Sequence, residues 1–129
     1  MRADTPLITC QVRVTRGEDI AIGPGKMALL AAIRDSGSIS GAARQMKMSY
    51  RRAWLLVETM NSCFVHPLVV TSTGGRAGGG AHLTPHGEQV LAGYAGLMEH
   101  IDAIAADYLR HLVLSTPLTD GPAPTDESA

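Results

Sequence analysis

Two adjacent arginines, Arg51 and Arg52, carry the chemistry that most narrows what this chain can do. A guanidinium group can donate two parallel hydrogen bonds to O6 and N7 of a guanine, or to a phosphate. Ser49 and Tyr50 stand directly before them and add two hydroxyls, beside the backbone N–H groups of an expected helix start. Leu55 adds an apolar side chain suited to the methyl group of thymine. Together these residues predict a surface that contacts DNA bases and phosphates.

The apolar spacing around these residues predicts a helix that presents them outward. Five apolar residues lie within about 60° of one direction at about 100° per residue: Ala53, Leu56, Val57, Met60 and Phe64. Arg51 and Leu55 lie opposite this stripe, and Arg52 lies to one side. Trp54, next to the stripe, is expected to flank the core. Paired arginines alone would equally suit a merely solvated helix face, so the neighbouring elements must decide between the two interpretations.

Two further helices are expected before this one, over residues 26–35 and 39–46. Ser38 and Ser49 stand where the second and third helices need an N-cap. Only Lys47-Met48 separates the second helix from Ser49. Two helices joined by so short a turn are typical of a helix-turn-helix, whose second helix lies in the major groove of DNA.

Short β hairpins are expected on both sides of the three helices. Residues 7–14 and 20–22 predict the first hairpin, and residues 68–71 and 81–83 predict the second. The loop of the second hairpin is rich in glycine and carries one charge, Arg76. It lacks the lysine and the Ser/Thr of a nucleotide-phosphate loop. We expect either a wing, in which Arg76 contacts a DNA phosphate, or only a flexible turn.

The last third of the chain predicts one long helix and a tail. Thr84-Pro85 is an N-cap followed by proline at the first helical position, and the helix can extend to about Leu114. Apolar residues alternate along it by four and three: Val90, Tyr94, Leu97, Ile101, Ile104 and Tyr108. At ~1.5 Å per residue the helix is roughly 45 Å long, so its second half needs another surface, most simply a second copy of the chain. Residues 116–129 are expected to form a disordered acidic tail after a single domain of residues 1–115.

These elements predict a fold that is mainly α with small β hairpins. The expected architecture is a winged helix-turn-helix with a long C-terminal dimerisation helix.

The charge of the chain is unevenly distributed, although its formal net charge is only −1 over 129 residues. Residues 34–84 have a net charge of +4, and residues 85–129 have a net charge of −6. A polyanion is therefore expected to bind the middle of the chain. No apolar run suits a signal peptide or a membrane span, and two cysteines make no disulfide framework. These features favour a cytoplasmic protein without membrane partners.

Metal binding and catalysis are less favoured than DNA binding. Cys63, His66, His82 and His86 superficially resemble a zinc ligand set, but one cysteine with three histidines is an uncommon structural site. We therefore expect no metal and no cofactor. No nucleophile with a base and an orienting group occurs, so the chain is not expected to be an enzyme.

Several short motifs form a specific set: Gly37-Ser38-Ile39-Ser40, Met48-Ser49-Tyr50-Arg51-Arg52-Ala53-Trp54, Pro67-Leu68-Val69, Gly78-Gly79-Gly80-Ala81 and Leu83-Thr84-Pro85-His86-Gly87. They resemble the N-terminal DNA-binding domain of the ModE family of molybdate-responsive transcriptional regulators, a LysR-like winged helix-turn-helix. The resemblance covers roughly residues 8–110. It implies a homodimer that binds a palindromic operator of molybdenum-related genes through the helix over residues 49–63. It also implies dimer contacts through the N-terminal region and the long last helix.

The resemblance stops short of the whole family architecture. Full-length members carry C-terminal molybdate-binding modules, and no residue of this chain matches them. Molybdate binding is therefore not transferred to any residue here.

The sequence thus predicts a dimeric, sequence-specific DNA-binding transcriptional regulator that resembles the ModE DNA-binding domain. Arg51, Arg52, Leu55 and Tyr50 are expected to contact bases, and Ser49 and Arg76 are expected to contact phosphates. One alternative is an accessory subunit that forms mixed dimers with a full-length regulator. Another is a module on the same fold that binds a metal or a small ligand.

Overall fold

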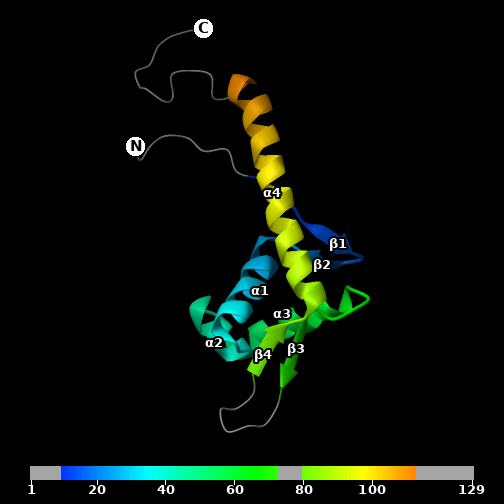
Figure 1. The fold of residues 1–129 in the computed structure, drawn as a ribbon, viewed down its shortest axis with the longest axis vertical. Helices are drawn as coiled ribbons and strands as arrows, with labels where there is room; N and C mark the ends of the chain where they lie inside the picture. Colours follow the sequence, from blue (N-terminus) through cyan, green and yellow to red (C-terminus); the bar gives the residue numbers. More distant parts are fainter. Residues whose placement is uncertain (1–9, 73–79, 113–129) are drawn as a thin grey trace. The chain divides into compact units, whose positions relative to one another are not determined.

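The computed structural model describes residues 10–72 and 80–112, with side chains up to residue 109. Two strands, three helices, two strands and a long helix follow one another (Figure 1). Their bounds are β1 Val14–Arg16, β2 Asp19–Ile22, α1 Pro24–Ser36, α2 Ile39–Gln45, α3 Tyr50–Ser62, β3 Val69–Ser72, β4 Gly80–Leu83 and α4 Pro85–Leu112. The predicted fold class, mainly helical with small hairpins and a long last helix, is confirmed.

Some predicted features lie outside the described residues. These are the wing tip with Arg76, the tail of residues 116–129 and the boundary at residue 115. Within the described ranges, no helix is long and apolar enough to cross a lipid bilayer.

The chain divides into two compact units. The larger unit, Gln11–Ala95, holds the four strands, the first three helices and the first part of α4. The smaller unit combines Met1–Cys10 with Gly96–Ala129, of which the structure describes Cys10 and the remainder of α4.

The core of the larger unit lies among α1, α2 and α3 and is completed by the second hairpin. Its five largest fully buried side chains come from α1, from α3 and from the residue just before β3: Leu29, Leu30, Ile33, Met60 and Leu68. Fully burying such a side chain contributes about 1.5–3 kcal/mol relative to leaving it exposed. No polar or charged side chain in the described part of the chain is buried. Apolar packing therefore holds the three helices together.

The N-caps that the sequence predicts are confirmed for α2, α3 and α4. The hydroxyls of Ser38, Ser49 and Thr84 each accept a hydrogen bond, at 2.9–3.0 Å, from the N–H group three residues further on. Each bond satisfies a backbone donor that has no partner inside the helix.

The first hairpin is shorter than the sequence predicts. The strand expected over residues 7–14 begins only at Val14; residues 10–13 form no strand, and residues 7–9 are not described. All three residues of β1 are exposed, and the register with β2 shifts between Val14 and Thr15. Since no buried face holds β1 in place, its β-branched composition overstates its length.

The start of α4 passes very close to the chain that leads into β3. A Cβ atom at Gly87 would overlap the carbonyl oxygen of Leu68, so only glycine fits this position. The Thr84 N–H donates to the same oxygen at 2.9 Å, and the Thr84 hydroxyl donates to the Pro67 oxygen at 2.7 Å. These contacts fix the start of α4 against the second hairpin.

Replacing this glycine tests that junction. Gly87→Ala should lower the free energy of unfolding by about 1–3 kcal/mol, because the backbone of Leu68 must move. Gly93→Ala is the matched control: a Cβ there meets nothing within 4 Å, and alanine suits a helix better by about 0.5–1 kcal/mol. Urea unfolding of both variants measures the two effects. Equal stability of the two variants would contradict the close approach.

Candidate nucleic-acid interface

Helix α3 is held in one orientation by its apolar stripe. Ala53, Val57 and Met60 are at most 3% exposed, and Leu56 and Phe64 are half-buried against the same core. The stripe predicted from the sequence is therefore confirmed. Because this face is packed, the opposite face of α3 is presented to solvent.

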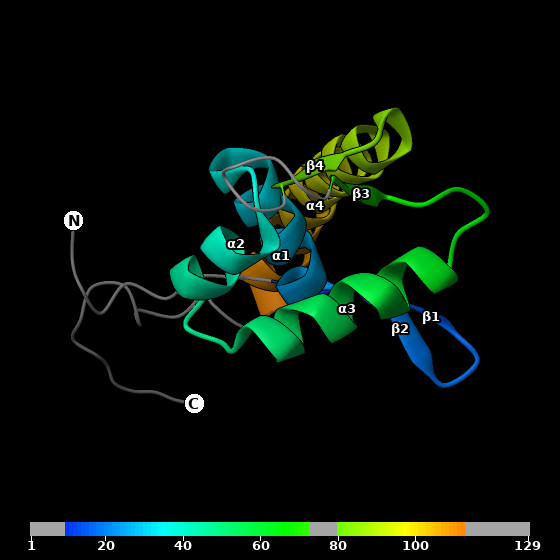
Figure 2. The same ribbon diagram turned by 90° about the horizontal axis from the view of Figure 1, so that it is seen from below.

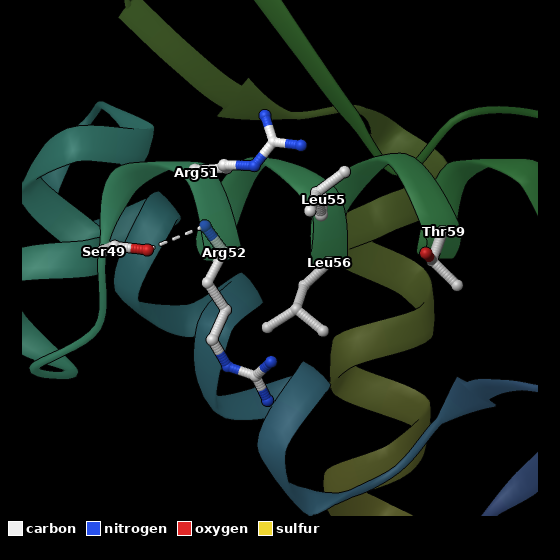
Figure 3. A pocket seen from close by; sticks show the side chains of 6 residues that line it. All are labelled: Ser49, Arg51, Arg52, Leu55, Leu56 and Thr59. Carbon is white, nitrogen blue, oxygen red and sulfur yellow. Dashed lines mark hydrogen bonds between the residues drawn. The ribbon is translucent and has the colours of Figure 1, made fainter.

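Arg51, Arg52 and Leu55 all lie on the solvent side of α3. Both arginines are exposed, and Leu55 is 43% exposed. Together with three neighbours they line a shallow groove along the helix: Ser49, Arg51, Arg52, Leu55, Leu56 and Thr59 (Figure 3). The two guanidinium groups leave the helix in different directions, because consecutive residues of a helix face different ways (Figure 3). The groove therefore carries one cation on its outward face and one on its flank.

Ser49 has a structural role at the start of this groove. Its hydroxyl oxygen accepts the N–H of Arg52, so that N–H is engaged in the cap. The hydroxyl hydrogen and the N–H groups of Tyr50 and Arg51 remain the donors that the first turn of α3 can offer to a phosphate.

The turn between α2 and α3 is as short as the sequence predicts. The N–H of Met46 donates to Ala42, and the N–H of Met48 donates to Ala43, each at 3.0 Å. Between them Lys47 has a φ of 59°, in the left-handed region that costs a non-glycine residue roughly 1–2 kcal/mol. This reversal lets α3 leave in a new direction directly after α2.

The side of α3 that faces the second hairpin carries two exposed aromatic residues. Tyr50 is 55% exposed and Trp54 is 40% exposed, so the prediction that Trp54 flanks the core is wrong. Trp54 lies about 100° around the helix from Ala53, which directs it toward the hairpin and not into the core. A hollow here is lined by Ser38, Ile39, Ser40, Tyr50, Trp54, Thr71, Ser72 and Gly80. The i, i+4 spacing of Tyr50 and Trp54 is the signal in the sequence for this surface.

Asn61 ties α3 to the second hairpin. Its side-chain oxygen accepts the N–H groups of Leu68, at 2.8 Å, and Val69, at 3.2 Å. Its side-chain nitrogen donates to the carbonyl oxygen of Val69 at 3.0 Å. One amide therefore sets the position of β3 relative to α3, although Leu68 lies seven positions further along the chain. Sequence reasoning missed this residue, because a polar side chain on an amphipathic helix carries no sign of its partner.

The elements of this surface match a known family. Residues 25–88 match the family of bacterial regulatory helix-turn-helix proteins of the LysR type. They form a LysR-type helix-turn-helix domain. Figure 2 shows this domain with α3, α2 and the second hairpin turned toward the viewer.

The sequence is also similar to several larger proteins. The molybdenum-pterin-binding protein MopB of Rhodobacter capsulatus is 42% identical over 93 residues, which cover 72% of this chain and 34% of that protein. The molybdenum transport protein ModE of Azotobacter vinelandii is 43% identical over 77 residues, 60% of this chain and 28% of that protein. The DNA-binding transcriptional dual regulator ModE of Escherichia coli K12 is 41% identical over 86 residues, 67% of this chain and 32% of that protein. The chain thus spans about a third of the length of these relatives, and the resemblance to the ModE family is confirmed.

The four residues whose spacing resembles a zinc ligand set, Cys63, His66, His82 and His86, differ in burial and position in the structure. Cys63 is buried at the end of α3, whereas His82 is exposed on β4. The rings of His66 and His86 meet edge to face, with centroids 5.8 Å apart. In the ranges that the structure describes, no three His, Cys, Asp or Glu side chains are grouped to hold a metal ion.

Removing the Asn61 side chain tests how the helix-turn-helix domain holds its wing. Asn61→Ala should destabilise the fold by about 1–3 kcal/mol, because two N–H groups and one carbonyl lose their partners. Hydrogen exchange of the Leu68 and Val69 amides should become faster. Ser62→Ala is the control, since that exposed hydroxyl donates only to Thr59 within its own helix. Unchanged exchange at residues 68 and 69 would contradict the role of Asn61.

Proposed function

We propose that this chain is a cytoplasmic, dimeric transcriptional regulator that binds double-stranded DNA with sequence specificity. Helix α3 lies in the major groove and reads base edges, as the second helix of a helix-turn-helix does. The observation that carries this proposal is the solvent-facing pair of Arg51 and Leu55, presented opposite a fully packed stripe. No catalytic step is part of the proposal.

The contacts follow from the chemistry of each side chain. Arg51 donates to O6 and N7 of a guanine, and Leu55 packs on a thymine methyl group. Tyr50 meets a neighbouring base from the flank of α3, and the Ser49 hydroxyl donates to a phosphate. Arg52 lines the same groove of the protein as Arg51, so it can contact either a base or the DNA backbone.

The names of the similar proteins indicate which genes this chain could regulate. Two of these proteins are named for molybdenum, and the Escherichia coli relative is named a DNA-binding transcriptional dual regulator. We therefore propose that the target genes concern the uptake or use of molybdenum.

Truncation of the outward arginine tests base recognition. Arg51→Ala should weaken binding to a duplex selected from a random library by about 1–3 kcal/mol, and it should relax the preference at one base position. Fluorescence anisotropy against the selected duplex and its single-base variants measures both effects. Arg34→Ala is the control, because Arg34 lies at the end of α1 and pairs with Asp35 at 3.1 Å. Equal weakening for every duplex would show that Arg51 does not read a base.

A homodimer is supported by the smaller unit. Its part of α4 exposes large apolar side chains: Leu97 is 44%, Ile104 57%, Tyr108 70% and Leu109 38% exposed. Leu97, Ile104 and Tyr108 belong to the predicted heptad-like seam, which a second copy of the same helix would cover. A two-fold dimer places two α3 helices on two half-sites, so we propose a palindromic operator.

A charge placed in this seam tests the dimer. Ile104→Lys should convert the protein to a monomer at micromolar concentration, because burying an unpaired ammonium group costs far more than the seam gains. Ala103→Lys is the matched control, since Ala103 directly precedes Ile104, is exposed and faces away from the seam. Light scattering coupled to size exclusion measures the mass of both variants. A wild-type protein that is already monomeric would overturn the proposed dimer.

A further inference from the structure

A second hollow lies on the flank of α3 that faces away from Trp54. It has a volume of about 370 Å³ and is lined by the chain before β1, by β2, by the start of α1, by the helix-turn-helix turn and by α3. Its lining residues are Gln11, Arg13, Ile20, Gly23, Pro24, Gly25, Lys26, Met46, Met48, Arg52 and Leu56. Three of them are charged, and all three are basic: Arg13, Lys26 and Arg52. The hollow is therefore a cationic surface assembled from three separate parts of the chain.

This hollow continues the groove that carries Arg51. Arg52 and Leu56 line both the groove and the hollow, so the two surfaces adjoin along the flank of α3. Figure 3 shows the Arg52 side chain extending along this flank, away from the guanidinium of Arg51. A DNA strand beside α3 would therefore meet the hollow without leaving the proposed interface.

The Arg13 side chain is exposed and passes close to the start of α1. Its Cγ atom lies 3.5 Å from the position that a Cβ atom of Gly23 would take, and Gly23 itself is buried at the start of α1. The aliphatic stem of Arg13 thus lies near Gly23, the N-cap residue of α1, three residues before Lys26. The residue precedes the helix-turn-helix match, which begins at residue 25.

We infer that Arg13, Lys26 and Arg52 bind the phosphodiester backbone of the DNA strand that runs beside α3. Arg51 then reads bases from the outward face, while its neighbour Arg52 neutralises a phosphate. The chain before β1, outside the helix-turn-helix, becomes part of the DNA-binding surface. This inference rests on the proposed function. It names the residues that supply the affinity of the protein for DNA of any sequence.

The chemistry of the hollow favours a phosphate backbone over a base edge. Guanidinium and ammonium groups both donate to phosphate oxygens, and an ammonium acts there as a point charge with no need for a fixed fork geometry. No acidic side chain of the described residues is among those that line the hollow. A chain of phosphates can engage charges from three elements at once, because it is itself extended.

Salt dependence of DNA binding tests the inference. The variants Arg13→Gln, Lys26→Gln and Arg52→Gln are measured by anisotropy over a salt series, with the selected duplex and with a scrambled duplex. Each phosphate contact that is lost should make the slope of log K against log salt shallower by about 0.9, and should weaken both duplexes by the same factor. Arg13→Lys should restore the slope, because it keeps the charge.

Arg34→Gln is the charge control, since it removes one cation outside the hollow. If it lowers the slope as much as Arg13→Gln does, the effect is one of net charge and the inference fails. Unchanged slopes in Arg13→Gln and Lys26→Gln also overturn it. A changed base preference at one position in Arg52→Gln would show that Arg52 reads a base. Thermal unfolding of each variant shows whether a loss of binding is instead a loss of fold.

Failure of this inference is distinct from failure of the proposed function. If the wild-type protein binds no duplex at low salt, the proposed function is wrong. If it binds and Arg51→Ala relaxes its specificity, but the flank variants keep the wild-type slope, only the inference is wrong.

Discussion

The burial of one stripe of α3 is the constraint on which the proposed DNA-binding surface depends. Ala53 and Met60 are fully buried, and Val57 is 3% exposed. Interiors are close-packed, so a helix cannot turn about its axis without opening voids or forcing overlaps. The direction of Arg51 and Leu55 therefore follows from the packing behind them. Since recognition of a base requires a side chain to be placed within a fraction of an ångström, this rigidity supports the base contacts proposed for Arg51 and Leu55.

The short segment of residues 67–69 links the elements that surround α3. Asn61 holds it from α3 with three hydrogen bonds, and Thr84 binds it from the start of α4. Gly87 allows α4 to approach the same backbone closely. A disturbance at any of these positions is thus expected to reach both α3 and the second hairpin. Side-chain hydrogen bonds to the backbone, which no apolar pattern encodes, thus help to hold α3 and the second hairpin together.

The sequence predicts those features that depend on local chemistry. The N-cap at Ser49, the start of α4 at Pro85 and the buried stripe of α3 all depend on residues within one or two turns. The first hairpin is wrong in length because β propensity depends on what a strand packs against, and β1 packs against little. The prediction that Trp54 flanks the core fails for a related reason. The exposure of Trp54 depends on a hollow beside a hairpin some twenty residues further along the chain. The close approach of Arg13 to Gly23, and the hydrogen bonds of Asn61 to Leu68 and Val69, depend on tertiary structure and leave no periodic signal.

The separation of Arg51 from Arg52 shows why a chain with a net charge of −1 can present a surface for a polyanion. Charges act mainly within a Debye length of about 8 Å at physiological salt, so the local arrangement matters more than the sum. Adjacent residues on a helix diverge by about 100°, and this divergence places one guanidinium on the outward face and the other beside Arg13 and Lys26. We therefore propose that two arginines adjacent in the sequence make two different kinds of contact with DNA. In the proposed interface, specificity depends on one arginine that the packing of α3 directs outward, and affinity depends on the three cations that line the hollow beside it.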